Sequence, residues 1–318
     1  MFKQAKLALA AMTLAAATLP AMAAPLYINT GQDFNLDPNG LTTTAVFDQL
    51  GYSGTLATSI YLGSPATPGT TVIDTNMPSV MNSYGFTPGS HTTLSGGSAN
   101  FAYPNDPSQT NIDALNNPRP GNDLNGFTGG VGFPQYGAGN VGGLGGAWGL
   151  TYSYQIVGKT VDSNGDGVSD YVQYTGGVFS VFYRSAATDP NNNKEVLRLI
   201  VTGSNIQLTN LSVSGYVDYL YAGGDTFVQN FFNSGDGLGT LYSNWLANNI
   251  SVSWVLDTNV DPPIPTPDQL WNTGSGLIRQ STLDGSLVIN VPEPGSLALV
   301  GLALAGLGFA QRRRALRK

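Results

Sequence analysis

Between residues 150 and 291 the chain alternates apolar and polar residues in short runs, which are separated by clusters of Gly, Asn, Asp, Ser and Pro. A period of two is typical of strands with one buried face. The clearest runs predict strands at Leu150–Val157, Tyr171–Tyr183, Val196–Leu208, Leu211–Leu220, Ile250–Asp257 and Ser286–Val291. The last of these is expected to close the sheet. Weaker strand patterns cover Thr43–Leu50, Thr55–Tyr61 and Thr70–Asp74.

Helical periodicity is rare in the same sequence. Leu238–Asn249 and Asn111–Leu115 fit short helices, and Thr226–Asn233 fits either a strand or a packed loop. Gly126–Gly149 is glycine-rich with interleaved aromatic residues, so we expect a long surface loop, with a patterned binding loop as the alternative. Asp261–Pro267 is rich in proline and is expected to be a stiff polyproline-like connector.

Short strands with frequent turns favour an all-β fold. We expect an antiparallel β-sandwich or a jelly-roll-like body rather than a fold of alternating strands and helices. No repeat of fixed period is visible, which excludes solenoids and propellers. We therefore expect one domain, and its weaker N-terminal patterns are compatible with a loosely ordered N-terminal third.

The two ends of the chain follow a different pattern from the body. Met1–Lys6 carries two lysines, Leu7–Leu19 is apolar, and Ala21-Met22-Ala23 offers small residues at a cleavage spacing. This order predicts a signal helix, a Sec-type signal peptide over residues 1–23, and therefore export, with the mature chain beginning at Ala24.

At the other end, the Pro-Glu-Pro sequence that follows Val291 cannot be helical, because each proline fixes its own φ and restricts the residue before it. From Gly295 to Gln311 there is no charge, and a helix of that length rises about 25 Å, the short end of what a bilayer core needs. Arginines at Arg312–Arg314 would hold the end in the cytoplasm. A single membrane-spanning helix is expected.

The order of turn, apolar helix and Arg-rich end resembles the PEP-CTERM sorting signal of Gram-negative bacteria. The resemblance implies that an exosortase recognises and removes residues 291–318, leaving a secreted body of residues 24–290. It also implies transient anchoring in the membrane and delivery to the cell surface or extracellular polysaccharide matrix. The alternative is a membrane anchor that stays. The sorting motif would consist of Val291, Pro292, Glu293, Pro294, Arg312, Arg313 and Arg314.

Removing both ends changes the charge of the protein. The whole chain has a net charge of −7, but the body holds 6 basic residues against 19 acidic ones, a net charge of −13. Such a body repels nucleic acid and anionic lipid, so cations or neutral polysaccharide are the expected partners. All but one of the 19 acids are Asp, which favours turns and calcium ligation.

Residues for catalysis are scarce. The chain has no Cys, so thiol chemistry and Cys-bound metals are excluded. His91 is the single histidine and lacks a nucleophile elbow, and Glu195 is the single Glu of the body. The sequence gives no pairing of carboxylates for glycosidase chemistry. We expect a protein that is not an enzyme.

The strongest internal motif runs from Asp162 to Asp170, and its D-x-N-x-D-G-x-x-D spacing resembles an EF-hand or dockerin-type calcium loop. The resemblance departs at position 12, where Gln173 replaces the bidentate Glu, so any site would be weak and structural. An Asp/Asn/Gly turn in a hairpin is the alternative. The ligands implied are Asp162, Asn164, Asp166, the carbonyl of Val168 and Asp170.

These features favour a non-enzymatic exported protein with a structural or adhesive role in biofilm or floc formation. The alternative is a carbohydrate-binding or glycan-cleaving module, in which exposed aromatic residues would stack on sugar rings. Each candidate aromatic is more often a core residue. Ice binding is a minor third reading, since regular Thr-x-Thr ranks are absent. The candidate aromatics are Trp148, Tyr152, Tyr154, Trp245, Trp254 and Trp271.

Overall fold

The computed structural model describes much of the body of the chain. The predicted signal helix, the Asn111–Leu115 helix, His91 and the predicted C-terminal helix lie outside the described residues. The chain divides into two compact units, Pro25–Ile289 and a unit formed by its two ends, and only the first is treated below. The described residues are 25–32, 42–44, 46–47, 49–86, 126–128, 148–184, 188–207, 210–235, 237, 239–248, 253–259 and 264–290.

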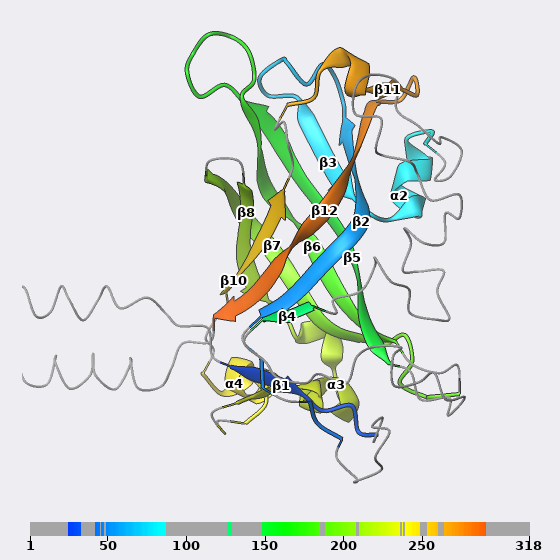
Figure 1. Cartoon of the computed structure of the whole chain (residues 1–318), viewed down its shortest axis with the longest axis vertical. Helices are drawn as coiled ribbons and strands as arrows, with labels where there is room; N and C mark the ends of the chain where they lie inside the picture. The colour runs from blue at the N-terminus through cyan, green and yellow to red at the C-terminus, as the bar shows by residue number, and fades with distance from the viewer. Residues whose placement is uncertain are drawn as a thin grey trace, which may run out of the picture. The chain divides into compact units, whose positions relative to one another are not determined.

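The body is built on one antiparallel sheet whose strands follow one another in chain order. Its last strand also pairs with its first, so eight strands form a closed ring (Figure 1). The ring consists of β2 (Gln49–Tyr61), β3 (Thr71–Thr75), β5 (Gly149–Val161), β6 (Tyr171–Arg184), β7 (Glu195–Gln207), β8 (Asn210–Val217), β10 (Ser253–Asn259) and β12 (Leu277–Asn290).

Smaller elements decorate the ring. The strands β4 (Gly126–Thr128) and β11 (Trp271–Asn272) pair with β2 and β12, and β1 (Leu26–Ile28) pairs with β9 (Phe232–Ser234) in a separate sheet. The described helices are short: α2 (Pro78–Ser83), η2 (Leu220–Ala222), α3 (Thr226–Phe231), α4 (Leu241–Asn248) and η3 (Pro267–Gln269).

The expected all-β, antiparallel class is confirmed, but the expected sandwich or jelly-roll arrangement is wrong. A sandwich needs two separate sheets, and a jelly roll needs strands that cross between them. Here β12 pairs with β2 from Leu277↔Tyr61 to Leu287↔Leu50 and joins the two edges of a single sheet. Alternation along the sequence indicates which side chains share a face of the sheet, but it does not indicate which strands are hydrogen-bonded neighbours.

Several predicted element bounds also differ from the structure. β12 begins at Leu277, nine residues before the predicted start, because its first half carries few apolar residues. Thr226–Asn233 was predicted as a strand or a packed loop, but it begins with a helix. This helix, α3, starts at Thr226 and has Asp225 as its N-cap. Within the predicted strand Thr43–Leu50, the described residues Thr43 and Phe47 form isolated bridges, and β2 begins at Gln49.

The inside of the ring is filled by side chains, most of them aromatic or branched. Tyr152 and Phe179 stack with ring centroids 5.1 Å apart, and Tyr154 lies 6.1 Å from the same phenylalanine. Rows of Tyr on neighbouring strands suit this interior because their rings pack over the pleat. Further buried side chains on these strands are Leu150, Ile156, Val181, Tyr183, Leu197, Leu199, Val201, Val213 and Val217.

The two ends of the ring differ in construction. The turn after β2 and the 162–170 loop after β5 lie at one end, named here the loop end (Figure 1). The opposite α4 end carries β1, β9, η2, α3 and α4. Its centre is an aromatic layer in which the Phe231 ring lies 5.6 Å from that of Tyr183 and 5.1 Å from that of Phe232.

Candidate functional site

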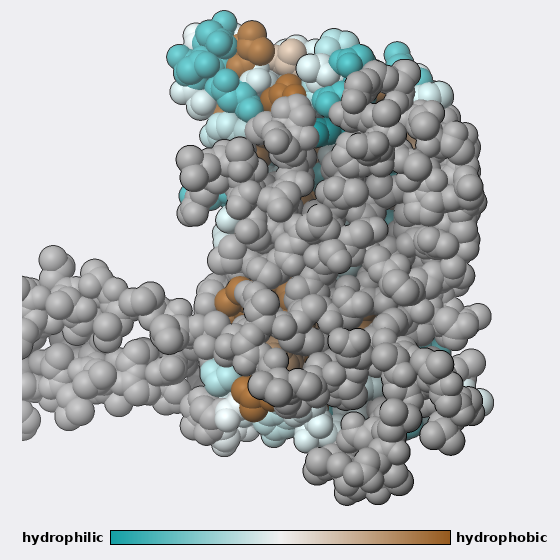
Figure 2. All heavy atoms as spheres, viewed as in Figure 1, coloured by the Kyte–Doolittle hydropathy of each residue, from teal (hydrophilic) through white to brown (hydrophobic). Residues whose placement is uncertain are grey.

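The Asp162–Asp170 segment is an exposed loop at the loop end, joining β5 to β6 in the hairpin that the sequence predicted as an alternative. Figure 2 shows hydrophilic side chains gathered at this end of the molecule. Asp162 accepts hydrogen bonds from the backbone N–H groups of Gly165 at 2.6 Å and Gly167 at 2.8 Å. Both glycines have positive φ, +81° and +86°, which lets the loop turn sharply around that carboxylate.

The other polar side chains of the loop also bind within it. Asp170 accepts from the N–H and hydroxyl of Ser163 at 2.7 and 2.6 Å. Asn164 and Asp166 each accept from a backbone N–H two residues ahead, at 2.8 Å. Within the residues that the structure describes, no three acidic or histidine side chains are grouped to hold a metal. The loop carboxylates therefore satisfy amides, and a cation would have to compete with those bonds.

These hydrogen bonds lower the pKa of two loop carboxyls. Amides of Gly167 and Gly165 lower the pKa of Asp162, and the Ser163 hydroxyl and amide lower that of Asp170. The two carboxyl groups bind protons more readily in the unfolded chain than in the folded one. Their contribution to the free energy of unfolding is therefore fully present above the unfolded pKa of about 3.9, and it is lost as the pH falls through their lower folded pKa values.

A pH titration followed by NMR should show this directly. The amide resonance of Gly167 is expected to shift when its acceptor, the Asp162 carboxylate, is protonated. The midpoint of this shift should lie below the ordinary Asp pKa of about 3.9. Asp162→Asn is expected to abolish that titration, since the amide cannot ionise. A Gly167 midpoint at or above the ordinary Asp value would contradict the loop geometry.

Most of the candidate aromatics are core residues. Trp148, Tyr152 and Tyr154 are 2%, 0% and 3% exposed, so they are not a platform for sugar rings. Trp271 is half-buried against the outer cluster formed by α2 and its neighbours, and Trp245 is half-buried on α4. The side chain of Trp254 and the seven residues of the predicted sorting motif lie outside the described parts.

A buried polar cluster inside the ring escaped the sequence reasoning. Asp74 on β3 is 5% exposed, and three hydroxyls from other strands donate to its carboxylate. Ser59 and Tyr154 donate at 2.7 Å, and Tyr174 donates at 3.1 Å. The buried Arg279 of β12, which stands opposite Ser59, interacts electrostatically with the same carboxylate. Four strands thus converge on one charge.

Burial controls the ionisation of this cluster. Desolvation raises the pKa of Asp74, while hydrogen bonds from Ser59, Tyr154 and Tyr174 and the charge of Arg279 oppose the rise. Desolvation likewise raises the pKa of Tyr61 to about 12. Perturbed groups often mark functional sites, but this cluster is enclosed and its carboxylate is saturated with donors. We interpret it as a structural centre that fixes the register of β2, β3 and β12.

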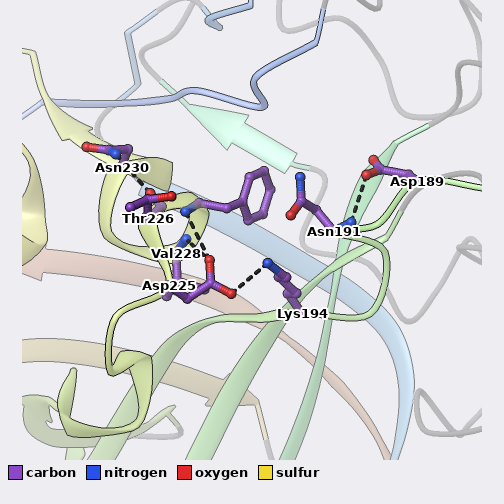
Figure 3. A network of polar contacts seen from close by, with 8 residues as sticks. Asp189, Asn191, Lys194, Asp225, Thr226, Val228 and Asn230 are labelled. Carbon is purple, nitrogen blue, oxygen red and sulfur yellow. Dashed lines mark hydrogen bonds and ion pairs between the residues drawn. The ribbon is translucent and has the colours of Figure 1, made fainter.

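A second polar network ties the turn between β6 and β7 to the start of α3 (Figure 3). Asp225 is the N-cap of α3 and accepts from the N–H groups of Phe227 and Val228 at 3.0 and 3.3 Å. The same carboxylate pairs with Lys194 at 2.6 Å. In the adjoining turn Asp189 accepts from the Asn191 N–H at 2.8 Å. Asp225 therefore both caps the helix and joins its first turn to the turn between β6 and β7.

Two substitutions separate the two roles of Asp225. Asp225→Ala removes cap and ion pair and should lower the free energy of unfolding by about 1–2 kcal/mol, most of it from the cap. Asp225→Asn keeps a capping oxygen and loses only a partly exposed ion pair, so a loss of about 0–1 kcal/mol is expected. Urea unfolding measures both. Equal losses for the two variants would contradict a capping role.

Glu195, the single Glu of the body, lies at the start of β7. It forms a bidentate pair with Arg198, at 2.8 and 2.6 Å. The Arg198 guanidinium in turn lies 4.5 Å from the centre of the Tyr221 ring. Among the helices that the structure describes, none has the length and apolar character needed to cross a membrane.

Comparison with known families identifies the tail of the chain. The family model of the PEP-CTERM protein-sorting motif matches residues 290–314. The expected resemblance of the tail is thereby confirmed, and the chain carries a PEP-CTERM sorting motif. This motif implies export, exosortase processing and a transient C-terminal anchor before processing. No curated protein and no solved structure matches the chain.

Proposed function

We propose that this chain is a non-enzymatic exported protein that exosortase releases to the cell surface or the extracellular polysaccharide matrix, where it has a structural or adhesive role in biofilm or floc formation. The observation that carries the proposal is the sorting motif at residues 290–314, directly after the last strand of the body. The strongly acidic body supports it, because its charge repels nucleic acid and leaves neutral polysaccharide and cations as the expected partners.

Intact mass spectrometry of protein from the medium, the cell surface and the inner membrane tests the sorting step. We expect a surface species that starts near Ala24 and ends around Pro292–Pro294. A variant with alanine at Pro292, Glu293 and Pro294 is the control and should remain uncut in the inner membrane. A surface species of the unmodified chain that still ends at Lys318 would mean a permanent anchor.

The role of the body needs a separate experiment. Deletion of the protein should change cell aggregation or the amount of matrix polysaccharide retained, and the unmodified chain should restore both. The triple alanine variant should fail to restore them, since it is not released. Unchanged flocs in the deletion strain would contradict the structural role without touching the sorting step.

The proposal includes a weak calcium site in the 162–170 loop. Its support is the donor set, which contains only the oxygen ligands that a hard cation prefers. Asp162, Asn164, Asp166, the Val168 carbonyl and Asp170 would ligate after exchanging amide hydrogen bonds for the cation. Calorimetric titration of the full chain should show binding at millimolar Ca²⁺ that Asp166→Ala removes. No heat of binding in that range would contradict the site.

A further inference from the structure

An apolar patch is exposed at the α4 end of the body. Leu220 of η2 is 80% exposed and Leu246 of α4 is 60% exposed. Tyr242 and Trp245 stand half-buried on the same helix, with ring centroids 5.6 and 6.0 Å from that of Tyr219, the neighbour of Leu220 in sequence. Figure 2 shows hydrophobic atoms at the surface near the position of α4. These four residues, Leu220, Tyr242, Trp245 and Leu246, are named the α4 patch.

The chemistry of the patch differs from that of the rest of the body. Around α4, from Gly237 to Leu256, the sequence has no charged residue, although the body as a whole is strongly acidic. Leu220 lies outside this run, and its N–H donates to the carboxylate of Asp218 at 2.9 Å. Exposed leucines beside Trp and Tyr are typical of surfaces that lie in the interface between lipid and water. A carbohydrate surface, by contrast, would need aromatic rings flanked by polar donors and acceptors rather than exposed leucines.

The patch lies at the end of the body from which the sorting tail departs. β12 runs toward the α4 end, where Leu287 pairs with Leu50 near the start of β2, and it ends at Asn290. Only residues 291–294 separate that strand from the uncharged run that begins at Gly295. Extended chain spans at most about 3.3–3.6 Å per residue, so Asn290 and Gly295 are at most about 18 Å apart.

The N-terminal side of the body leaves at the same end. Leu26 forms a bridge with Phe47, two residues before β2 begins at Gln49. The first described residues of the body and the end of its last strand therefore both lie at the α4 end.

We propose that the α4 patch rests in the lipid–water interface of the membrane while the sorting tail anchors the chain. The proposal rests on the transient anchor that the sorting motif implies. A short tether gives the patch a high effective concentration at the bilayer surface, so weak burial of two leucines and two aromatic rings is sufficient. The contact orients the body with its acidic loop end away from the membrane, and it is lost when the tail is removed.

Site-specific fluorescence tests this orientation, because the chain has no native Cys. Leu246→Cys carries an environment-sensitive fluorophore in the full chain. The chain is reconstituted in vesicles of phosphatidylethanolamine and phosphatidylcholine, two lipids without net charge, with brominated acyl chains. Val168→Cys is the matched control, since Val168 is an apolar residue that is 50% exposed at the loop end. We expect several-fold stronger quenching at position 246 than at position 168.

Two further measurements make the result decisive. Leu220→Asp, added to the Leu246→Cys chain, should reduce the quenching while the circular dichroism of the sheet stays unchanged. Equal quenching at positions 246 and 168 would overturn the proposal. The proposal would also be overturned if position 246 were shielded from water only in membranes that contain exosortase, because that result would indicate a surface that docks on the enzyme. A chain that fails to float with the vesicles at all would instead contradict the anchor, and with it the proposed function.

Discussion

Asp74→Ala is expected to lower the free energy of unfolding by about 3–5 kcal/mol, because it takes one buried polar group away from several buried partners. The substitution removes the negative charge that interacts with the buried Arg279. It also takes the acceptor away from the hydroxyls of Ser59, Tyr154 and Tyr174. Buried donors without an acceptor keep their full desolvation cost. The loss should therefore exceed that of any single hydrogen bond in the cluster.

Urea unfolding at neutral pH measures this loss against two controls. Tyr174→Phe removes one donor and leaves the Asp74 carboxyl group with its other partners, so a loss of about 1 kcal/mol is expected. Asp268→Ala changes an exposed aspartate and should stay within about 0.5 kcal/mol. If Asp74→Ala were no more harmful than Asp268→Ala, the cluster would not hold the ring together.

Gly177→Ala is expected to be the second severe substitution, with a loss of about 2–5 kcal/mol from backbone strain and overpacking together. Gly177 has φ of +127°, a conformation that L side chains rarely adopt. An added Cβ would lie 2.5 Å from the Cα of Ile156, its partner on β5, and closer still to the Gln155 carbonyl oxygen. Neither contact can be relieved without separating β5 from β6.

The neighbouring Gly176 provides the matched control. A Cβ on Gly176 meets nothing within 4 Å, and this glycine is not among those with positive φ. Gly176→Ala should therefore change the free energy of unfolding by at most about 1 kcal/mol. Thermal or urea unfolding of the two variants gives the comparison. Equal free energies of unfolding for Gly177→Ala and Gly176→Ala would contradict the close approach of β5 and β6 at Gly177.

The middle of the fold was predictable because its information is local. The alternation in Tyr171–Tyr183 and the Asp/Asn/Gly turn before it specify a hairpin, and β6 extends over Tyr171–Arg184. The glycines of the turn adopt the positive φ that the motif requires. Burial of Trp148 and Tyr152 also follows from alternation, since large aromatics at every second position fill an interior.

The ring closure and the buried charge were not predictable, because both depend on partners far apart in sequence. Nothing near Asp74 in sequence distinguishes it from the other aspartates of this chain, and Arg279 lies in a stretch for which the sequence predicted no strand. Their association follows from the pairing of β12 with β2, which places Arg279 opposite Ser59. The apolar residues of α4 were predicted as a helix, but their exposure follows only from the packing of Tyr219 beneath them.

The pairing of first and last strands also sets an order of events during export. β2 and β10 keep open edges until β12 arrives, and β12 is the last part of the body to cross the membrane. Contacts between such distant segments form late and leave edges that attract other chains in the meantime. The sorting motif begins at residue 290, where β12 ends, so the strand that closes the sheet is also the strand next to the tail.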